Sequence, residues 1–373
     1  MRIMNRNADE SAAPSASIDS SCCQDADIDC VEELVIDSVD ADVTPFSNST
    51  CDVHVQTDHN QTVCLSCGNN LPEEPKFGIN QFVGDREGLK FYTGCDNLEI
   101  FYSILHSLGP AAYQLTYWQD VKPKISVVDQ LLLALMKIRT HKVNFEIARF
   151  FDIPENDVSP IFFTWIRFMA LQWSEIDIWP SKELVRFYAP LDFKKKYPNT
   201  RVIVDGVEIP VKKPSKPLAQ RCTFSKYKNR NTAKALVGIT PGGMVSFISD
   251  AYGGSTSDRQ ITERSSLLTR TEYGDSIMAD KGFNVQDLFE AKNVIINIPT
   301  FFKKMNRMSN KTVMRDRAIA SKRVHVERII GLAKTYKILT SPLNCTETLL
   351  ASDILFICFM LVNFRPCIIH RNA

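Results

Sequence analysis

Three acidic residues of the chain are placed where they could bind a divalent metal ion. Asp205 lies in VIVDGVEIP, Asp280 in IMADKGF and Glu327 in KRVHVERIIG. The first two follow short apolar runs, so we expect each to lie just past the end of a strand, where ligands bind in open α/β sheets. Carboxylates that converge there repel one another, and a divalent cation removes that cost. For Asp205 with Gly206, the alternative is an ordinary turn pair.

Glu327 lies on a predicted helix, beside the stripe that should be buried. The stripe consists of Val326, Ile329, Ile330 and Ala333. Arg323 is one turn before Glu327 and Gly331 is one turn after it, so Glu327 could be a surface residue in an i, i+4 pair worth only tenths of a kcal/mol. Alternatively, the basic residues meet phosphates, and Gly331 lets a substrate approach closely. His325 should be structural, because it points about 200° away from Glu327 around the helix axis.

Basic residues gather near these acids. Eight lysines and arginines and no acid lie between Lys212 and Lys234, with Phe224 and Tyr227 among them. A second basic cluster runs from Lys303 to Arg317. A single charge run is usually a solvated face, but two runs beside an acid cluster favour phosphate binding that does not read base sequence.

The charge of the chain is segregated, although lysines and arginines (44) nearly balance acids (43). Residues 1–60 carry 13 acids and two bases, so we predict a disordered acidic leader over 1–75 and a basic body that binds a polyanion. Within this leader, the spacing of Cys51, His54, Cys64 and Cys67 leaves a zinc site open as an alternative to an unstructured tail. Eleven cysteines without a dense framework favour a reducing compartment.

Residues 76–195 read as an all-helical domain. Helices are predicted over 98–108, over 127–139 with Ser126 as N-cap, and over 144–151. A last helix should begin at Pro160, with Ser159 as its cap. The succession resembles a helix-turn-helix, and a plain three-helix bundle is the alternative.

Residues 196–373 read as a mixed α/β domain. Strands are expected over 201–204, 207–211, 276–279 and 294–298, with a hairpin formed by 235–239 and 244–249. Helices are expected over 261–268, 285–292, 316–336 and 346–364. The apolar stretch 349–364 is short and contains Asp353, so we expect a buried helix and no membrane span.

Several blocks, in this order, resemble the DDE-superfamily endonucleases of eukaryotic DNA transposons, with the Harbinger and IS5-like groups most similar. They are DGVEIPV, GGSTSDRQ, ADKGF and KRVHVERIIGLAKTYKIL, and the resemblance spans roughly residues 98–365. It implies an RNase H-like sheet with flanking helices, on which Asp205, Asp280 and Glu327 form a catalytic triad holding Mg²⁺ or Mn²⁺. Asp258 matches a further acid of the family.

The implied partners are double-stranded transposon ends and target DNA, a second copy of the chain, and a separate DNA-binding protein. The expected location is the nucleus, with the cytoplasm as alternative. A domesticated adaptor that binds DNA without cutting it is the alternative function. The expected DNA contacts are Lys212, Lys213, Lys226, Lys228, Arg230, Arg323 and Lys334.

Overall fold

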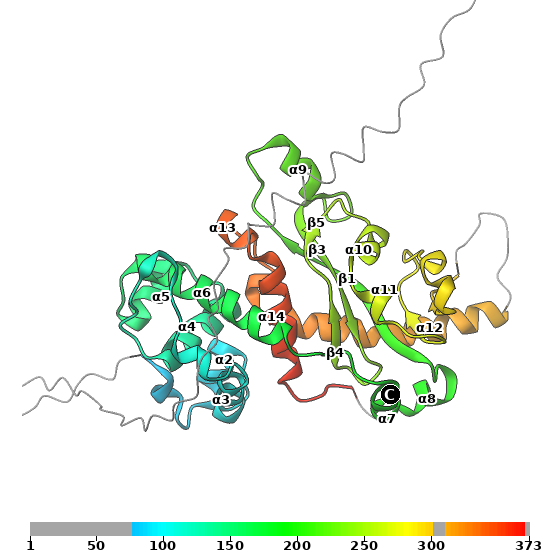
Figure 1. Ribbon diagram of the computed structural model, residues 1–373, viewed down its shortest axis with the longest axis horizontal. Helices are drawn as coiled ribbons and strands as arrows, with labels where there is room; N and C mark the ends of the chain where they lie inside the picture. Colours follow the sequence, from blue (N-terminus) through cyan, green and yellow to red (C-terminus); the bar gives the residue numbers. More distant parts are fainter. Residues whose placement is uncertain (1–76, 301–309, 370–373) are drawn as a thin grey trace, which may run out of the picture.

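The computed structural model describes residues 77–300 and 310–369 (Figure 1). The predicted acidic leader, with its candidate zinc ligands, lies outside these residues. A helical part and a sheet part meet at α14 (Ala351–Asn363), which lies between them in Figure 1. No helix in the described ranges has the length and apolar character needed to cross a membrane.

The helical part follows the predicted order. The predicted helices are α3 (Leu98–Ser107), α4 (Val127–Thr140) and α5 (Asn144–Phe151), and the Ser126 hydroxyl caps α4 by accepting a hydrogen bond from the Asp129 N–H. Two further elements, η2 (Ile79–Phe82) and α2 (Arg86–Thr93), precede them. The short helices η3 (Pro110–Tyr113) and η4 (Trp118–Asp120) connect α3 to α4.

The last helix of this part corrects the predicted start at Pro160. Helix α6 (Glu155–Ser174) begins five residues earlier and contains Pro160. The carbonyl that Pro160 leaves without a partner is that of Asn156, which is exposed and can bond to water. Helix α6 packs on α4, α5 and α14. The predicted helices α3, α4 and α5 are therefore confirmed. DNA contact by α6 as part of a helix-turn-helix stays a prediction.

A seven-stranded mixed sheet forms the second part, in the order β2-β3-β1-β6-β7, with β4 and β5 also paired to β3. Strand β1 is antiparallel to β3 and parallel to β6, and β6 is parallel to β7. The mixed α/β class is thus confirmed. The strands are β1 (Thr200–Pro210), β2 (Phe224–Ser225), β3 (Arg230–Ile239), β4 (Val245–Ile248), β5 (Tyr252–Gly253), β6 (Ser276–Met278) and β7 (Ile295–Asn297).

Strand β1 corrects the predicted break at Asp205 and Gly206. It runs unbroken through both residues, because β3 pairs with it continuously from Ile203 to Pro210. Side chains alternate across the sheet. Ile203 and Val207 accordingly face the core under α12 (Asn310–Ala333) and α14, whereas Val202 and Val204 face the second core on the other side.

Helices cover both faces of the sheet. Two predicted single helices are each divided, because 261–268 forms α10 (Asp258–Arg264) and α11 (Leu267–Arg270), and 346–364 forms α13 (Cys345–Thr348) and α14. Asn344 caps α13 in a capping box with Glu347. The remaining helices are α7 (Lys182–Tyr188), α8 (Leu191–Lys196), α9 (Pro217–Thr223), η5 (Gln286–Lys292) and η6 (Lys337–Leu339).

Polar contacts fasten α14 to both parts of the molecule. The Ser352 hydroxyl accepts a hydrogen bond from the Ala251 N–H, and the Asn363 amide bonds both backbone groups of Val245. On the helical side, Asp353 pairs with Arg167 of α6 at 2.9 Å. The apolar residues of α14 belong to one core cluster that includes residues of both parts.

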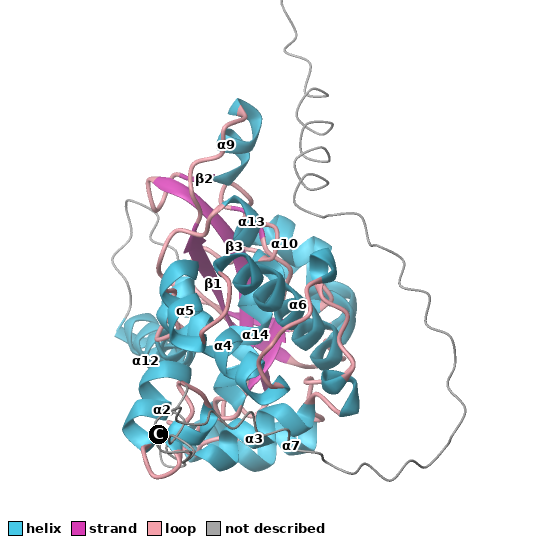
Figure 2. Ribbon diagram, turned by 90° about the vertical axis from the view of Figure 1, so that its left-hand side faces the viewer, coloured by secondary structure: helices cyan, strands magenta, loops and turns pink. Residues whose placement is uncertain are grey.

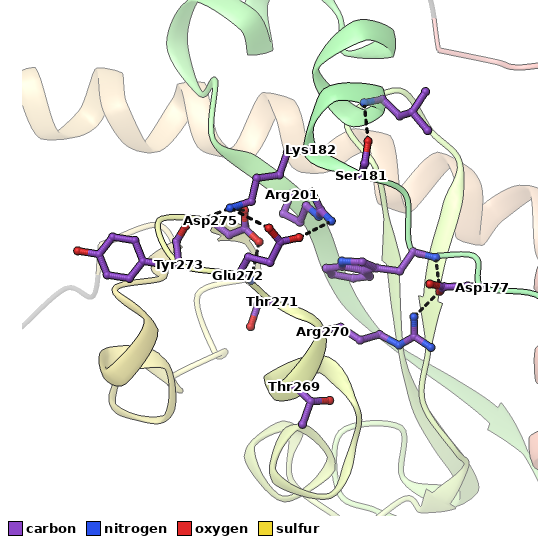
Figure 3. Close-up of polar contacts among 12 residues, drawn as sticks. Asp177, Ser181, Lys182, Arg201, Thr269, Arg270, Thr271, Glu272, Tyr273 and Asp275 are labelled. Atoms are coloured by element: carbon purple, nitrogen blue, oxygen red, sulfur yellow. Dashed lines mark hydrogen bonds and ion pairs between the residues drawn. The ribbon is translucent and has the colours of Figure 1, made fainter.

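The segment that joins the two parts is held against the start of β1 (Figure 3). The buried Arg201 guanidinium pairs with Glu272 at 3.1 Å and lies over the Trp179 ring. Lys182 pairs with Glu272 at 3.2 Å, and Asp177 pairs with Arg270. These contacts fix the amino-terminal end of β1.

Candidate metal-binding and DNA-binding site

Strand register brings Asp205 and Asp280 to the same end of the sheet. The last parallel pair between β1 and β6 joins Ile203 to Met278, and each aspartate lies two residues further along its own strand direction. Asp280 therefore follows its strand as predicted. Asp205 lies inside β1 but past the end of its parallel pairing, which leaves that edge of β1 open.

Glu327 reaches this end from α12, which packs on the face of β1 that Asp205 shares with Ile203 and Val207. The predicted stripe of α12 is buried, so the helix is fixed in rotation and Glu327 lies at its edge, with 54% of its side chain exposed. His325 is buried on another side, where its Nδ1 lies 3.3 Å from the Pro241 carbonyl oxygen. Burial lowers the pKa of His325, and its placement agrees with the predicted structural role.

The three acids line one cavity of about 650 Å³, together with Asp258. Gly331 also lines it, and a Cβ at that position would meet no described atom within 4 Å. The structure thus brings together the four acids singled out from the sequence. Four cations share the cavity wall: Lys228, Lys234, Arg323 and Lys334.

Arg323 lies between two of the acids. Its Nη1 is 3.0 Å from Oδ1 of Asp280, its Nη2 is 3.6 Å from Oε1 of Glu327, and only 12% of its side chain is exposed. Within residues 77–300 and 310–369, no group of three or more His, Cys, Asp or Glu side chains is arranged to hold a metal ion. Arg323, which the sequence had suggested as a phosphate contact, thus supplies a positive charge beside Asp280 and Glu327.

The carboxyl group of Asp205 lies in surroundings that disfavour its ionised form. Burial raises its pKa, and the charges of Asp280 and Glu327 raise it further. The Arg323 guanidinium and a hydrogen bond from the Gly206 N–H at 2.9 Å oppose this, but the pKa remains above its ordinary value. An ionised Asp205 is therefore costly until a further cation is present.

Two lysines of the cavity have different surroundings. Nζ of Lys234 lies 2.9 Å from Oδ1 of Asp258, at the first turn of α10, so this lysine is committed to an ion pair. Burial lowers the pKa of Lys334, and the neighbouring Lys228 and Arg230 lower it further. The surroundings of Lys334 therefore disfavour its charged form, and a bound phosphate would stabilise that form.

A second cavity, of about 1030 Å³, adjoins the first, and Glu208, Tyr227 and Lys234 line both. Of the predicted DNA contacts, Lys213 and Lys226 line this second cavity. Lys212 and Arg230 are exposed at the end of β1 and the start of β3. Together the two cavities form what we call the basic groove.

The predicted site set omitted Glu208 and Arg221, which also line the groove. Arg221 could have been selected from the basic run, whereas Glu208 carries no signal in the sequence. Part of the second basic run, with Lys303, Lys304 and Arg307, lies outside the described residues.

Residues 204–363 match the family model described as DDE superfamily endonuclease. The match begins one residue before Asp205 and includes Asp280 and Glu327. This part of the chain therefore belongs to the DDE superfamily endonucleases, a class of nuclease and transposase domains that act on DNA, and the resemblance drawn from the sequence is confirmed at that level. No curated protein and no solved structure was found to match the chain.

Proposed function

We propose that the chain is a metal-dependent DNA endonuclease of the transposase type, which cleaves phosphodiester bonds and joins the cut strand to target DNA. The observation that carries the proposal is the meeting of Asp205, Asp280 and Glu327 in one cavity, from two strands and a helix, within the segment that matches the family. The Harbinger and IS5-like assignment is part of this proposal.

The chemistry of the donor set fits Mg²⁺ or Mn²⁺. Carboxylate oxygens are the hard ligands that these ions prefer, and a cation here would remove the cost of ionising the desolvated Asp205. Asp205, Asp280 and Glu327 would hold the metal, with Asp258 as an additional acid. When bound, two such ions supply an activated water and stabilise the leaving oxygen of the cleaved bond.

The basic residues of the groove hold and orient the DNA backbone. Lys228 and Lys334 lie on the wall of the acid cavity and pair with phosphates next to the bond to be cut. Arg323, released from Asp280 and Glu327, contributes a third contact, and Gly331 leaves room for the backbone to approach the carboxylates. The contacts position DNA without reading its sequence.

A second function is favoured by one observation, the pairing of Arg323 with two of the three acids. If Arg323 stays in place, it occupies the carboxylates of Asp280 and Glu327 that a metal ion would need, and the remaining bases of the groove bind DNA without cutting it. The chain would then be a domesticated adaptor. For either function we propose that it works in the nucleus, with the cytoplasm as the alternative, as a homo-oligomer together with a separate DNA-binding protein.

Cleavage of supercoiled plasmid in the presence of Mn²⁺ separates the two functions. We expect the wild-type protein to nick the plasmid and Asp205→Ala to abolish nicking while it still retards DNA at low salt. Asp287→Asn is the matched control, because Asp287 is an exposed acid paired with Arg259 and lies outside the acid cavity. A wild-type protein that retards the plasmid but never nicks it would establish the adaptor.

A further inference from the structure

Tyr227 presents an unusually exposed aromatic ring at the junction of the two cavities. Its side chain is 84% exposed, and no large apolar side chain of the described residues is more exposed. It lines both the acid cavity and the larger cavity, and Nζ of Lys228 lies 4.5 Å from the centre of its ring. A ring that contributes nothing to the core and lies beside the acid cavity is available for a ligand.

The backbone holds this ring at a defined place. Tyr227 lies at the tip of the short hairpin of β2 and β3, where Phe224 pairs with Asn231 and Ser225 with Arg230. The Lys228 N–H donates to the Ser225 hydroxyl at 3.2 Å, which closes the tip. Figure 2 shows β2 and α9 projecting from one end of the sheet. The hairpin therefore holds the backbone of Tyr227 at a defined position beside the two cavities.

Cations surround the ring. Lys226 and Lys228 flank Tyr227 in the chain, and Lys213 and Arg221 line the larger cavity together with it. Phe224 adds a second aromatic ring to that cavity and is 39% exposed. Aromatic rings interleaved with lysine and arginine bind single-stranded nucleic acid, because bases stack on the rings while the cations hold the phosphates.

We propose that Tyr227 stacks on the face of an unpaired base next to the phosphate that lies over Asp205, Asp280 and Glu327, so that the groove takes locally opened DNA. This inference rests on the proposed function. Inside a closed duplex both faces of each base are covered by its neighbours, so away from the DNA ends the Tyr227 ring can stack only on a base that has left the helix. The larger cavity, lined by Phe224 and by Ser225, Thr256 and Ser257, has the volume to receive that nucleotide.

Binding measurements on matched DNAs test the inference. Fluorescence anisotropy in EDTA, which prevents cleavage, would compare a closed duplex with the same duplex carrying a short mismatched bubble. We expect Tyr227→Ala to weaken binding to the bubble roughly 5- to 150-fold, the range expected for one lost stacking contact, and to change binding to the closed duplex little. Tyr227→Phe should bind both DNAs like the wild type.

Two controls exclude simpler explanations. Tyr273→Ala removes an aromatic ring that is 74% exposed but lies outside both cavities, and Figure 3 shows that ring pointing away from its neighbours. It should leave binding to the bubble unchanged. Tyr227→Leu keeps an apolar side chain without a ring and should fail like Tyr227→Ala. A fluorescent adenine analogue in the bubble should be quenched by the wild type and by Tyr227→Phe only.

The outcomes distinguish this inference from the proposed function. Equal losses on closed and opened DNA, or normal bubble binding by Tyr227→Leu, overturn the stacking role while wild-type nicking of plasmid still supports the nuclease. If the wild type binds neither DNA, both the inference and the proposed function fall. If it binds but never nicks, the stacking result still stands, now for an adaptor that holds opened DNA.

Discussion

Asp205 and Asp280 occupy equivalent positions on neighbouring parallel strands, because each lies two residues beyond the paired residues Ile203 and Met278. Their closeness is therefore fixed by the backbone of the sheet and does not depend on a flexible loop. Glu327 joins them from a helix whose rotation is fixed by its buried stripe. The acid cavity is thus a rigid place where negative charge is collected at some expense of stability.

Asp205→Asn should stabilise the metal-free protein at neutral and higher pH. Because the folded pKa of Asp205 is above its ordinary value of 3.8, folding disfavours the ionised form. That penalty is absent at low pH and develops as the pH rises through the folded pKa. The melting temperature of the variant should equal that of the wild type near pH 4 and exceed it near pH 8.

With Mn²⁺ present at pH 8, the wild type should melt at a higher temperature than Asp205→Asn. Mn²⁺ should raise the melting temperature of the wild type more at pH 8 than at pH 5, because protons compete with the metal for Asp205, and should affect Asp205→Asn much less. Identical Mn²⁺ shifts in the two proteins would show that the metal binds elsewhere.

Arg323→Gln should increase the affinity for Mn²⁺ and weaken the metal-free fold. The substitution removes the charge that pairs with Asp280 and Glu327, so these carboxylates become free for a cation but repel one another without one. Calorimetric titration with Mn²⁺ measures the affinity, and thermal melts in EDTA measure the stability. Arg259→Gln is the control, because Arg259 pairs with Asp287 outside the cavity. A lower affinity in Arg323→Gln would mean that this arginine holds the carboxylates in binding positions.

The salt dependence of DNA binding should identify the lysines that contact phosphate. Each lost contact should reduce the slope of log K against log salt by about 0.9, so Lys213→Ala and Lys228→Ala should each show this change and the double variant about twice as much. Lys90→Ala should leave the slope unchanged, because Lys90 lies in α2 and pairs with Asp96. Slopes that do not differ from the wild type would place the DNA on another face.

Glu347→Ala should destabilise the junction of α4 and α13 by about 3–5 kcal/mol, because it leaves the buried Lys137 without its carboxylate. Burial raises the pKa of Glu347, but hydrogen bonds from His141 and the Asn344 N–H and the charge of Lys137 outweigh it and lower the pKa overall. The stabilisation is therefore present above the ordinary carboxyl pKa and is lost as the pH falls through the folded value. Urea titrations at pH 7 and pH 3 should show the variant much weaker at pH 7 and closer to the wild type at pH 3.

Local signals predicted most elements well. Ser126 marked the start of α4, and Pro241 to Gly243 marked the β3–β4 hairpin, because caps and turns depend on neighbours in the chain. The same reasoning failed at Asp205 and Gly206, where a turn signal is overridden by pairing with β3. It also failed at Pro160, where burial of α6 outweighs one missing hydrogen bond.

For the site, strand positions pointed to Asp205 and Asp280 and a predicted helix face pointed to Glu327, and the structure places the three acids around one cavity. Their roles in catalysis and metal binding stay predictions. The pairing of Arg323 with Asp280 could not be predicted, because it joins side chains 43 positions apart through the packing of α12 on the sheet. The register of β1 against β6 could not be predicted from the sequence either, because parallel strands distant in the chain are brought together only by tertiary contacts.

The position of α14 has a consequence for how the chain matures. Residues 351–363 fill the core that the helical part shares with one face of the sheet and also support α6, so this shared core cannot close before the helix has left the ribosome. During synthesis, more than 300 residues are made before the segment that completes this core. A premature stop codon before Ala351 would therefore leave uncovered the apolar surfaces of both parts that α14 covers, and the truncated product should be found in aggregates or degraded by proteases.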